Sequence, residues 1–428
     1  MPLFLGIDIG TSGVRTSVIN AQKREVAAAR VEMKAPDKVD GRAVQDPWIW
    51  DRAVNDCLEQ QAGRLADAGL SIRDIVALAV DGTSGTLMLA DKNLDPVTLG
   101  LMYNSGNFFS EAEVIAQVAP SDSIALGPSS ALARLLFAQK LPDAKHAAFV
   151  FHQADWIAAK LLGQGGSSDE NNVLKLGYDL QSTCWPEWLG QTGVRTELLP
   201  AVHPVGDTLG RINPLMATRY GFSQNTHIVA GTTDGNAAFL ASGASEIGEA
   251  STSLGTTLAI KLISHQPVTC PKRGVYSHRL FGRWLAGGAS NTGGGALLSH
   301  FSREEIKTLQ SQLCPFDDTG LDYYPLAGIG ERFPINDPHL QSRVTPRPES
   351  DARFLQGLLE GIARVERSAY DTLCELGGPP VRSVTTTGGG ALSDSWTKIR
   401  QRILNCPVSV ARADAAFGTA LVAHRSSH

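Results

Sequence analysis

A run of apolar residues that stops at an acid and a glycine turn, near the start of the chain, constrains the fold more than any other feature. Residues 3–7 are mostly apolar and indicate a buried strand, which ends at Asp8 and leads into Gly10 and Gly13. Residues 14–19 then form a second apolar run with β-branched side chains. The pattern predicts a hairpin of two strands with a tight turn between them.

This turn has the chemistry of a phosphate site. Gly10 allows close backbone approach, and the hydroxyls of Thr11 and Ser12, with the turn amides, can donate hydrogen bonds to phosphate oxygens. The carboxylate of Asp8 beside the turn suits a divalent cation on a nucleotide. A strand that ends in an acid and a turn without any chemistry is the alternative interpretation.

A similar segment occurs about half the chain later. Residues 253–262 again place a small polar turn, Leu-Gly-Thr-Thr, before a strand. Gly-Thr pairs are common in turns, so the repeat could be coincidental. We favour two related lobes, each offering a phosphate-binding hairpin to one nucleotide.

Alternating strand and helix signals predict an α/β fold. Residues 48–65 carry apolar side chains at helical spacing after Asp46 and Pro47, and residues 74–80 indicate a buried strand. That strand leads into the loop 81–85. Because ligands of open α/β sheets gather where strands end, we expect this loop to face a cleft.

Composition narrows the class of protein. The 428 residues carry a formal net charge of -5 without a long basic run, which argues against binding to nucleic acid or to anionic membranes. No apolar stretch is long enough to span a bilayer, and no leader precedes the first strand. The six cysteines are widely spaced, as expected of thiols in a reducing compartment. We therefore expect a cytoplasmic enzyme.

Ten stretches spread over residues 3–423 resemble one family. They are residues 6–13, 80–86, 230–234, 237–244, 274–278, 287–291, 320–326, 330–335, 388–391 and 415–420. The chain resembles the FGGY carbohydrate kinases, and within them the short ribulose-kinase branch of cyanobacteria and plants. The resemblance implies a two-lobed, actin-like ATPase (ribonuclease H-like) α/β fold with its active site in the interdomain cleft. It also implies an N-terminal lobe over residues 1–228 and a C-terminal lobe over residues 229–428.

Asp234 is the catalytic candidate. It follows a predicted buried strand at a glycine-flanked turn, before a helix of small residues predicted over 236–243. In the FGGY kinases the acid at this position is the base that accepts the sugar hydroxyl proton during phosphoryl transfer. A helix N-cap is the alternative role, and one side chain can serve both.

The resemblance also assigns the nucleotide site. ATP and Mg²⁺ are the implied cofactors, with Asp8 organising the metal and also touching the sugar. Gly10, Thr11 and Ser12 would hold phosphate on one lobe, and Gly255 and Thr256 on the other. A third set would hold the adenine, consisting of Gly389, Gly390, Ser393 and Trp396. Trp396 as a plain core residue stays an open alternative.

The resemblance implies that Asp8, Ser84 and Asp234 contact the sugar. Xylulokinases carry a His-Gly-Gln loop and a Trp-x-Asp-x-Arg segment, whereas residues 81–83 here read Asp-Gly-Thr and residues 103–107 read Tyr-Asn-Ser-Gly-Asn. The family signature with Lys and Trp appears with Arg134 and Phe137 in those places. These departures favour D-ribulose as the substrate of a monomeric or homodimeric kinase.

Other functions stay open. A xylulose or other polyol kinase is one, and a regulatory actin-like ATPase with weak or no sugar kinase activity is another. A NAD-dependent enzyme is excluded because no Gly-x-Gly-x-x-Gly follows the first strand. Asp169 matches an acidic position of related kinases, but helix capping or a surface loop would explain it equally well.

Overall fold

The computed structural model describes residues 1–411 and 413–426, without side-chain detail at residues 391 and 392. The expected α/β fold is confirmed, and the chain divides into two compact units. Unit 1 consists of Met1–Ala241 together with Ala413–His428, and unit 2 consists of Ser242–Arg412.

A six-stranded sheet forms the centre of unit 1, in the order β12-β13-β6-β1-β2-β3. Its strands are β1 (Leu3–Ile9), β2 (Gly13–Asn20), β3 (Glu25–Glu32), β6 (Ile75–Gly82), β12 (Thr208–Arg211) and β13 (His227–Thr233). The strands β1, β6 and β13 are parallel to one another, so their carboxyl ends lie along one edge of the sheet. This edge is where an open α/β sheet places its ligands.

The predicted first hairpin is confirmed. β1 and β2 pair antiparallel from Leu3 opposite Asn20 to Ile9 opposite Val14. Every residue of β1 is buried, because the strand lies inside the sheet with both faces covered. The predicted helix also forms, as α1 (Pro47–Asp67), with the Asp46 side chain accepting from the Trp48 amide as its N-cap.

A second sheet and several helices complete the first 241 residues. The sheet order is β4-β5-β8-β7-β9, and β10 and β11 form a separate parallel pair. These strands are β4 (Asp37–Val39), β5 (Arg42–Gln45), β7 (Leu87–Ala90), β8 (Gly100–Leu101), β9 (Phe149–His152), β10 (Ser167–Asp169) and β11 (Ala201–His203). The helices are α2 (Phe109–Val118), α3 (Ala131–Ala138), α4 (Gln153–Leu162), α5 (Trp188–Gln191), α6 (Pro214–Tyr220) and α7 (Asp234–Ala241).

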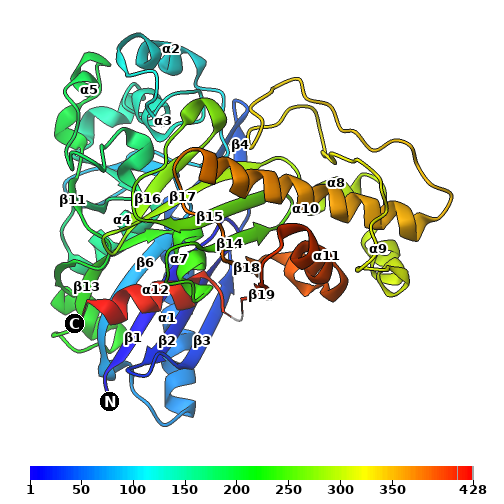
Figure 1. Ribbon diagram of the computed structural model, residues 1–428. Helices are drawn as coiled ribbons and strands as arrows, with labels where there is room; N and C mark the ends of the chain where they lie inside the picture. The colour runs from blue at the N-terminus through cyan, green and yellow to red at the C-terminus, as the bar shows by residue number, and fades with distance from the viewer. Residues whose placement is uncertain (412, 427–428) are drawn as a thin grey trace. The chain divides into compact units, whose positions relative to one another are not determined.

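The last helix, α12 (Ala415–Arg425), packs against β1, β2, β6 and α7 of unit 1. In Figure 1 it is the red helix that lies over the blue strands. The contact is backbone to backbone, since a Cβ at Gly6 would lie 2.1 Å from the Ala416 carbonyl oxygen. A Cβ at Gly418 would likewise lie 1.8 Å from the Ala237 carbonyl oxygen. Both positions therefore require glycine.

Unit 2 contains a six-stranded sheet in the order β16-β17-β15-β14-β18-β19. Its strands are β14 (Glu249–Leu254), β15 (Leu258–Ser264), β16 (Tyr276–Leu280), β17 (Arg283–Ser290), β18 (Ser383–Thr387) and β19 (Val408–Val410). Its helices are α8 (Gly294–Leu298), α9 (Arg303–Leu309), α10 (Asp351–Glu375) and α11 (Asp394–Leu404), with α11 beside the long α10 in Figure 1. The predicted second hairpin is β14 and β15, which pair antiparallel.

Two features differ in position from the expectations. The strand β13 continues through the expected boundary between residues 228 and 229, because it pairs with β6 inside the sheet of unit 1. The strand β6 ends at Gly82 rather than Val80, so Asp81 is part of the sheet and not of the loop. Within the described residues, no helix is both long and apolar enough to cross a membrane.

Candidate active site

Three carboxylates meet at the carboxyl ends of the parallel strands of unit 1. Asp8 is the penultimate residue of β1 and pairs in register with Asp81 of β6. Asp81 also pairs in register with Thr232 of β13, two residues before Asp234. The sheet order therefore brings Asp8, Asp81 and Asp234 to one edge.

Asp8 is buried and carries an ion pair. Its Oδ2 accepts a hydrogen bond from Nη1 of Arg15 at 2.8 Å, across the hairpin. Burial raises the pKa of Asp8 above its ordinary value, and the Arg15 guanidinium opposes this shift. Arg15 thus occupies one carboxylate oxygen, and Asp81 also lies within hydrogen-bonding reach of Asp8.

Asp81 is a member of this cluster that the sequence analysis did not single out. It is completely buried and accepts a hydrogen bond from the Thr419 hydroxyl of α12. Burial, followed by the negative charge of Asp8, raises the pKa of Asp81 well above its ordinary value. Its Oδ1 has no ordinary hydrogen-bond donor among the described residues. Asp8 and Asp81 lie within hydrogen-bonding reach, so a proton on either would bridge them.

Asp234 lies in the first turn of α7 and is half-buried. The helix begins at Asp234 itself, two residues earlier than expected, and the Asp234 Oδ1 accepts from the Gly235 amide at 2.6 Å. The strand end before it is held by Thr232, whose Oγ1 accepts from the side-chain amides of Asn171 and Asn236, each at 3.2 Å. The negative charge of Asp234 reaches Asp81, where it contributes to the raised pKa.

Ser84 lies in the turn that follows β6 and is the only residue of 81–86 that is not buried. The neighbouring Thr83 and Thr86 are held by buried hydrogen bonds. Gln153 Oε1 accepts from the Thr83 amide at 3.1 Å and from the Thr83 hydroxyl at 2.8 Å. The Thr83 and Thr86 hydroxyls are 2.7 Å apart. The turn thus presents one hydroxyl on a rigid base.

The tip of the first hairpin is accessible. Gly10 and Thr11 are half-buried and Ser12 is exposed, while the Gly10 amide donates to the Gly13 carbonyl at 3.0 Å and closes the turn. The backbone behind the tip is anchored, because the Met33 amide donates to the Ser12 carbonyl at 2.9 Å. The tip can therefore receive phosphate oxygens without rearrangement of the sheet.

Unit 2 brings its own two predicted nucleotide segments together. Ser253 of β14 pairs in register with Thr387 of β18, so the turn at Gly255 and the glycine loop share one edge of the sheet. Gly388 has a φ of +85°, and a Cβ there would lie 2.8 Å from the Leu254 carbonyl oxygen, so glycine is required. Gly389 is exposed with open space above it. Thr256 is also exposed.

Ser393 and Trp396 both lie at the start of α11, just after the glycine loop. Ser393 is the N-cap of α11, where its hydroxyl oxygen accepts from the Trp396 amide at 3.3 Å. The Trp396 ring belongs to the hydrophobic core of unit 2 and lies beneath Gly390. Its Nε1 has no hydrogen-bond acceptor among the described residues. The structure therefore accounts for Trp396 as a core residue.

Beneath these segments lies a buried ionic network that fixes their strands. Arg400 of α11 forms a fork with Glu366 of α10, at 2.6 Å from Nε and 2.7 Å from Nη2. Arg400 also donates to the hydroxyl of Thr386 in β18, and Glu366 accepts from the hydroxyl of Thr252 in β14. Burial alone would lower the pKa of Arg400, but the charge of Glu366 raises it. The two strands that carry the candidate nucleotide residues are thus clamped to two helices.

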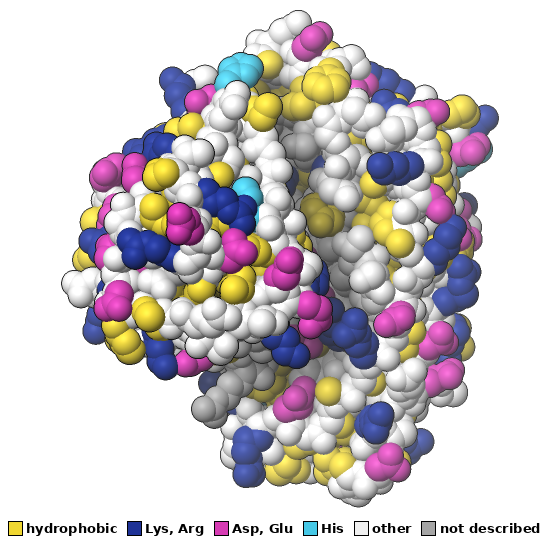
Figure 2. Space-filling model, turned by 90° about the vertical axis from the view of Figure 1, so that its right-hand side faces the viewer, with side chains coloured by type: hydrophobic (Ala, Val, Ile, Leu, Met, Phe, Trp, Pro, Cys, Tyr) yellow, Lys and Arg dark blue, Asp and Glu magenta, His cyan; other side chains and the backbone are white. Residues whose placement is uncertain are grey.

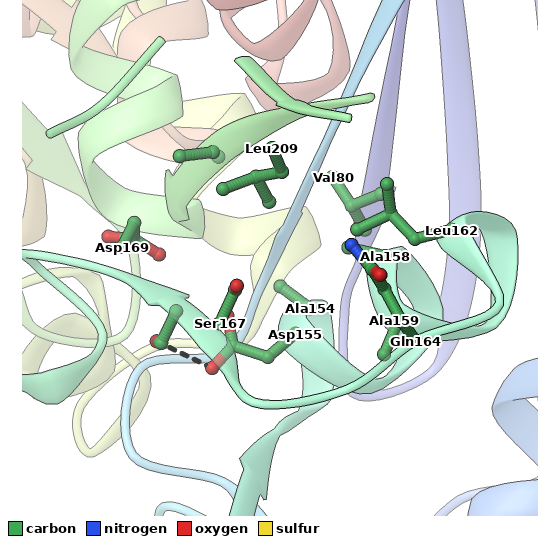
Figure 3. Close-up of a pocket in the computed structure, with 13 residues that line it drawn as sticks. Val80, Ala154, Asp155, Ala158, Ala159, Leu162, Gln164, Ser167, Asp169 and Leu209 are labelled. Atoms are coloured by element: carbon green, nitrogen blue, oxygen red, sulfur yellow. Dashed lines mark hydrogen bonds between the residues drawn. The ribbon is translucent and has the colours of Figure 1, made fainter. Parts of the chain in front are cut away.

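Asp169 is buried, so of the alternatives left open for it the surface loop is contradicted. It lies in β10 with an exposed fraction of 2 % and accepts from the amides of Asn171 and Asn172, at 2.8 and 3.0 Å. Figure 3 shows it on the wall of a small cavity with Asp155 of α4, which accepts a hydrogen bond from Ser168. The cavity of about 10 Å³ has room for one water molecule. Burial, followed by the charge of Asp155, raises the pKa of Asp169 to about 8.

The residues present fit a magnesium ion bound mainly through water. Among the described residues no group of three acids, histidines or cysteines could enclose a metal ion. Mg²⁺ needs fewer, because it keeps several waters and binds through one or two carboxylates. Asp8 provides such a carboxylate, and Asp81 adds a buried oxygen without a donor.

Two family models together match nearly the whole chain. The N-terminal domain of the FGGY family of carbohydrate kinases matches residues 3–241, and the C-terminal domain of the same family matches residues 250–427. The chain belongs to the FGGY family of carbohydrate kinases. It is accordingly an ATP-dependent sugar kinase, and the implied ATP and sugar substrates agree with the expectation.

Proteins similar to this FGGY kinase are named as kinases of different substrates. The xylulose kinase of Escherichia coli is 23 % identical over 418 residues, which cover 93 % of this chain and 84 % of that protein. The autoinducer-2 kinase of Klebsiella pneumoniae is 24 % identical, covering 99 % of this chain and 85 % of that protein. Among solved structures, the kinase from Brucella ovis has a TM-score of 0.89 at 23 % identity, over 99 % of this chain and 90 % of that chain. This structural likeness supports the two-domain, actin-like fold.

The sequence contains a signal for the position of Asp81. Asp8 and Asp81 each follow a run of mostly apolar residues, and a glycine comes within two positions after each, at Gly10 and Gly82. If Asp81 is assigned to the end of a strand, and not to the start of a loop, both acids are predicted to lie at one edge of the sheet.

On the face drawn in Figure 2, acidic and basic side chains of this FGGY kinase are interspersed, and neither sign forms a broad patch.

Proposed function

We propose that the chain phosphorylates D-ribulose, with Asp234 as the general base. The observation that carries the proposal is the meeting of Asp8, Asp81 and Asp234 at the carboxyl edge of one sheet, next to the accessible Ser84. A kinase needs one carboxylate to accept the hydroxyl proton and another to organise the metal. Asp234 is half-buried at a helix start, whereas Asp8 is tied to Arg15, which favours this division of roles.

In the proposed reaction, a sugar hydroxyl attacks the γ-phosphorus of ATP. The new oxygen–phosphorus bond forms as the bond between the γ-phosphorus and the bridging oxygen breaks, and ADP leaves with that electron pair. Asp234 receives the hydroxyl proton. Magnesium, when bound near Asp8, would neutralise phosphate charge. Ser84 and Asp8 would orient the sugar by hydrogen bonds to its other hydroxyls.

The nucleotide assignments are part of the same proposal. Thr11 and Ser12 supply donors beside Gly10 in unit 1, and Thr256 does so beside Gly255 in unit 2. The open surface above Gly389, next to Gly390, suits a flat adenine ring. Ser393 and Trp396 would lie at its margin, although both also have structural roles in α11.

D-Ribulose is preferred because two xylulokinase segments are replaced here. Residues 81–83, at the end of β6, carry the buried Asp81 and Thr83 in place of histidine and glutamine. Xylulose is the second candidate, since several similar proteins are named xylulose kinases. Substrate choice within such a family depends on few pocket contacts.

The decisive experiment measures ADP release with Mg²⁺ and ATP for D-ribulose, L-ribulose, D-xylulose, L-xylulose, glycerol and no sugar. We expect the highest kcat/KM for D-ribulose. A preference for D-xylulose would move the assignment to the second candidate, and release of ADP without any dependence on sugar would support a regulatory ATPase.

The base is tested with Asp234→Ala. Loss of a positioned base typically costs about 10²–10⁴-fold in rate, so kcat for the sugar should fall by that factor while the Kd for ATP changes little. Asp394→Ala is the control, because Asp394 is an exposed acid at the start of α11 that forms a surface ion pair with Lys398. A wild-type rate in the Asp234 variant would rule out its role as the base.

A further inference from the structure

Arg134 is a buried cation without a carboxylate partner in the described part of the chain. It lies on α3 with an exposed fraction of 1 % and makes no ion pair there. Burial lowers its pKa to about 10, so it stays charged at neutral pH. A buried guanidinium without an acid is costly, and a protein that keeps one must satisfy it with other acceptors.

Its acceptors are backbone carbonyls from two separate segments. Nη1 donates to the Gly85 carbonyl at 3.0 Å, inside the turn that carries Ser84. Nη2 donates to the Ser105 carbonyl at 2.9 Å and to the Tyr103 carbonyl. One planar fork therefore joins the Ser84 turn to the segment 103–105.

The two segments are joined a second time by a neutral contact. The hydroxyl oxygen of Thr86 accepts from the Tyr103 amide at 3.0 Å. Gly85 has a φ of +87°, and a Cβ there would lie 3.3 Å from Arg134 Nη1, so the turn rests directly on the guanidinium. In the joined segments Ser84 is half-buried, Tyr103 is 45 % exposed and Asn104 is also exposed.

We propose that Arg134 is a positioning residue that determines sugar specificity by fixing the Ser84 turn against the Tyr103–Ser105 segment. The inference rests on the proposed function, in which Ser84 contacts a ketopentose. Epimeric ketopentoses differ in the direction of one hydroxyl, so discrimination requires that the Ser84 hydroxyl be held in place. Arg134 acts through the backbone and does not itself touch the sugar.

The first test is Arg134→Lys, which keeps the charge but has no planar fork to reach both segments. Hydrogen bonds from a charged donor are worth about 1.5–3 kcal/mol, which corresponds to roughly 10–150-fold. We expect the KM for the preferred ketopentose to rise about tenfold or more, with the KM for ATP within about twofold. The ratio of kcat/KM between that sugar and its epimer should fall by a similar factor.

A matched control is Arg195→Lys. Arg195 also donates to two carbonyls, of Ala144 at 2.8 Å and Ala147 at 3.1 Å, but these do not belong to the Ser84 turn. The Arg195→Lys substitution should lower thermal stability without changing sugar discrimination. Thr86→Val removes the contact with the Tyr103 amide and also the hydroxyl contact with Thr83. It leaves Arg134 in place, and it should reproduce the change in discrimination if the lysine variant does not fold.

Hydrogen exchange of peptides spanning 82–88 and 101–107 separates this inference from the proposed function. Faster exchange in both peptides of the lysine variant, together with altered discrimination, supports the proposal. Unchanged exchange, or KM values for sugar and ATP that rise equally, would overturn it. If the wild-type enzyme phosphorylates no ketopentose, the proposed function fails. Faster hydrogen exchange in both peptides of the lysine variant would then still support the coupling of the two segments by Arg134.

Discussion

At Asp169 in β10, three hydrogen bonds and burial act on one carboxyl group in opposite directions. The amides of Asn171 and Asn172 and the side-chain amide of Asn172 donate to it, which favours the charged form. Burial and the nearby Asp155 prevail, and the pKa is about 8. The neutral acid needs an acceptor for its proton, and Asn172 Oδ1 has no partner among the described residues. A rotated Asn172 amide would supply that acceptor.

This pKa predicts how stability depends on pH. The unfolded carboxyl group has a pKa of about 3.9, so between about pH 4 and pH 8 the folded protein binds one more proton than the unfolded protein. Its contribution to the free energy of unfolding therefore falls as the pH rises through this window. Asp169→Asn removes the titration, and we expect its Tm relative to wild type to rise steadily from pH 5 to pH 8.

The control is Asp179→Asn. Burial alone would raise the pKa of Asp179, but hydrogen bonds from the Ser182 hydroxyl and from the backbone amides of Gln181 and Ser182 together lower it. Its effect on stability therefore changes only at acidic pH, and the Tm difference from wild type should be flat between pH 5 and pH 8. A flat difference for Asp169→Asn as well would contradict the raised pKa.

At the scale of elements, the fit of α12 to β1 predicts a severe effect at Gly6. Gly6→Ala would place a methyl group 2.1 Å from the Ala416 carbonyl oxygen and 2.3 Å from the Ala420 nitrogen, so the helix must shift away from the sheet. Overpacking of this kind costs about 1–3 kcal/mol or more in the free energy of unfolding. Urea denaturation should record the loss.

Gly63→Ala is the matched substitution with the opposite expected sign. Gly63 lies inside α1, and a Cβ there would meet nothing within 4 Å. Replacing a helical glycine with alanine should stabilise the protein by about 0.5–1 kcal/mol. If both variants had equal stability, the close contact at Gly6 would be wrong.

Elements that depend on neighbouring residues could be predicted from the sequence, whereas contacts between residues far apart in the chain could not. Both hairpins and α1 could be predicted because hydrophobic period, glycine turns and an N-cap at Asp46 are local signals. The burial of Asp169 and the core position of Trp396 depend on partners distant in sequence. The bond between Thr419 and Asp81 spans 338 positions, and no local pattern specifies it.

At the scale of the whole molecule, unit 1 is assembled from both ends of the chain. A stop after residue 412 would remove α12, and with it the Phe4–His424 ring contact at 4.7 Å and the hydrogen bond to Asp81. We expect limited proteolysis to degrade unit 1 of this truncated chain and to leave a resistant fragment from unit 2. The full-length chain should resist over both units, and a truncated chain with an equally resistant unit 1 would contradict the prediction.

The return of α12 also sets the order in which the protein can be completed on the ribosome. Domains usually fold in the order of their synthesis, from the N-terminus onward. Here the first 241 residues emerge early and include α1 and α4, which pack on the sheet, but α12 is absent until residues 415–425 have been translated. Unit 2 lies entirely between these two segments. Unit 1, which begins the chain, is therefore the last unit to be completed. Until α12 has been translated, the apolar strand β1 lacks the contact with α12 that buries part of it in the folded protein.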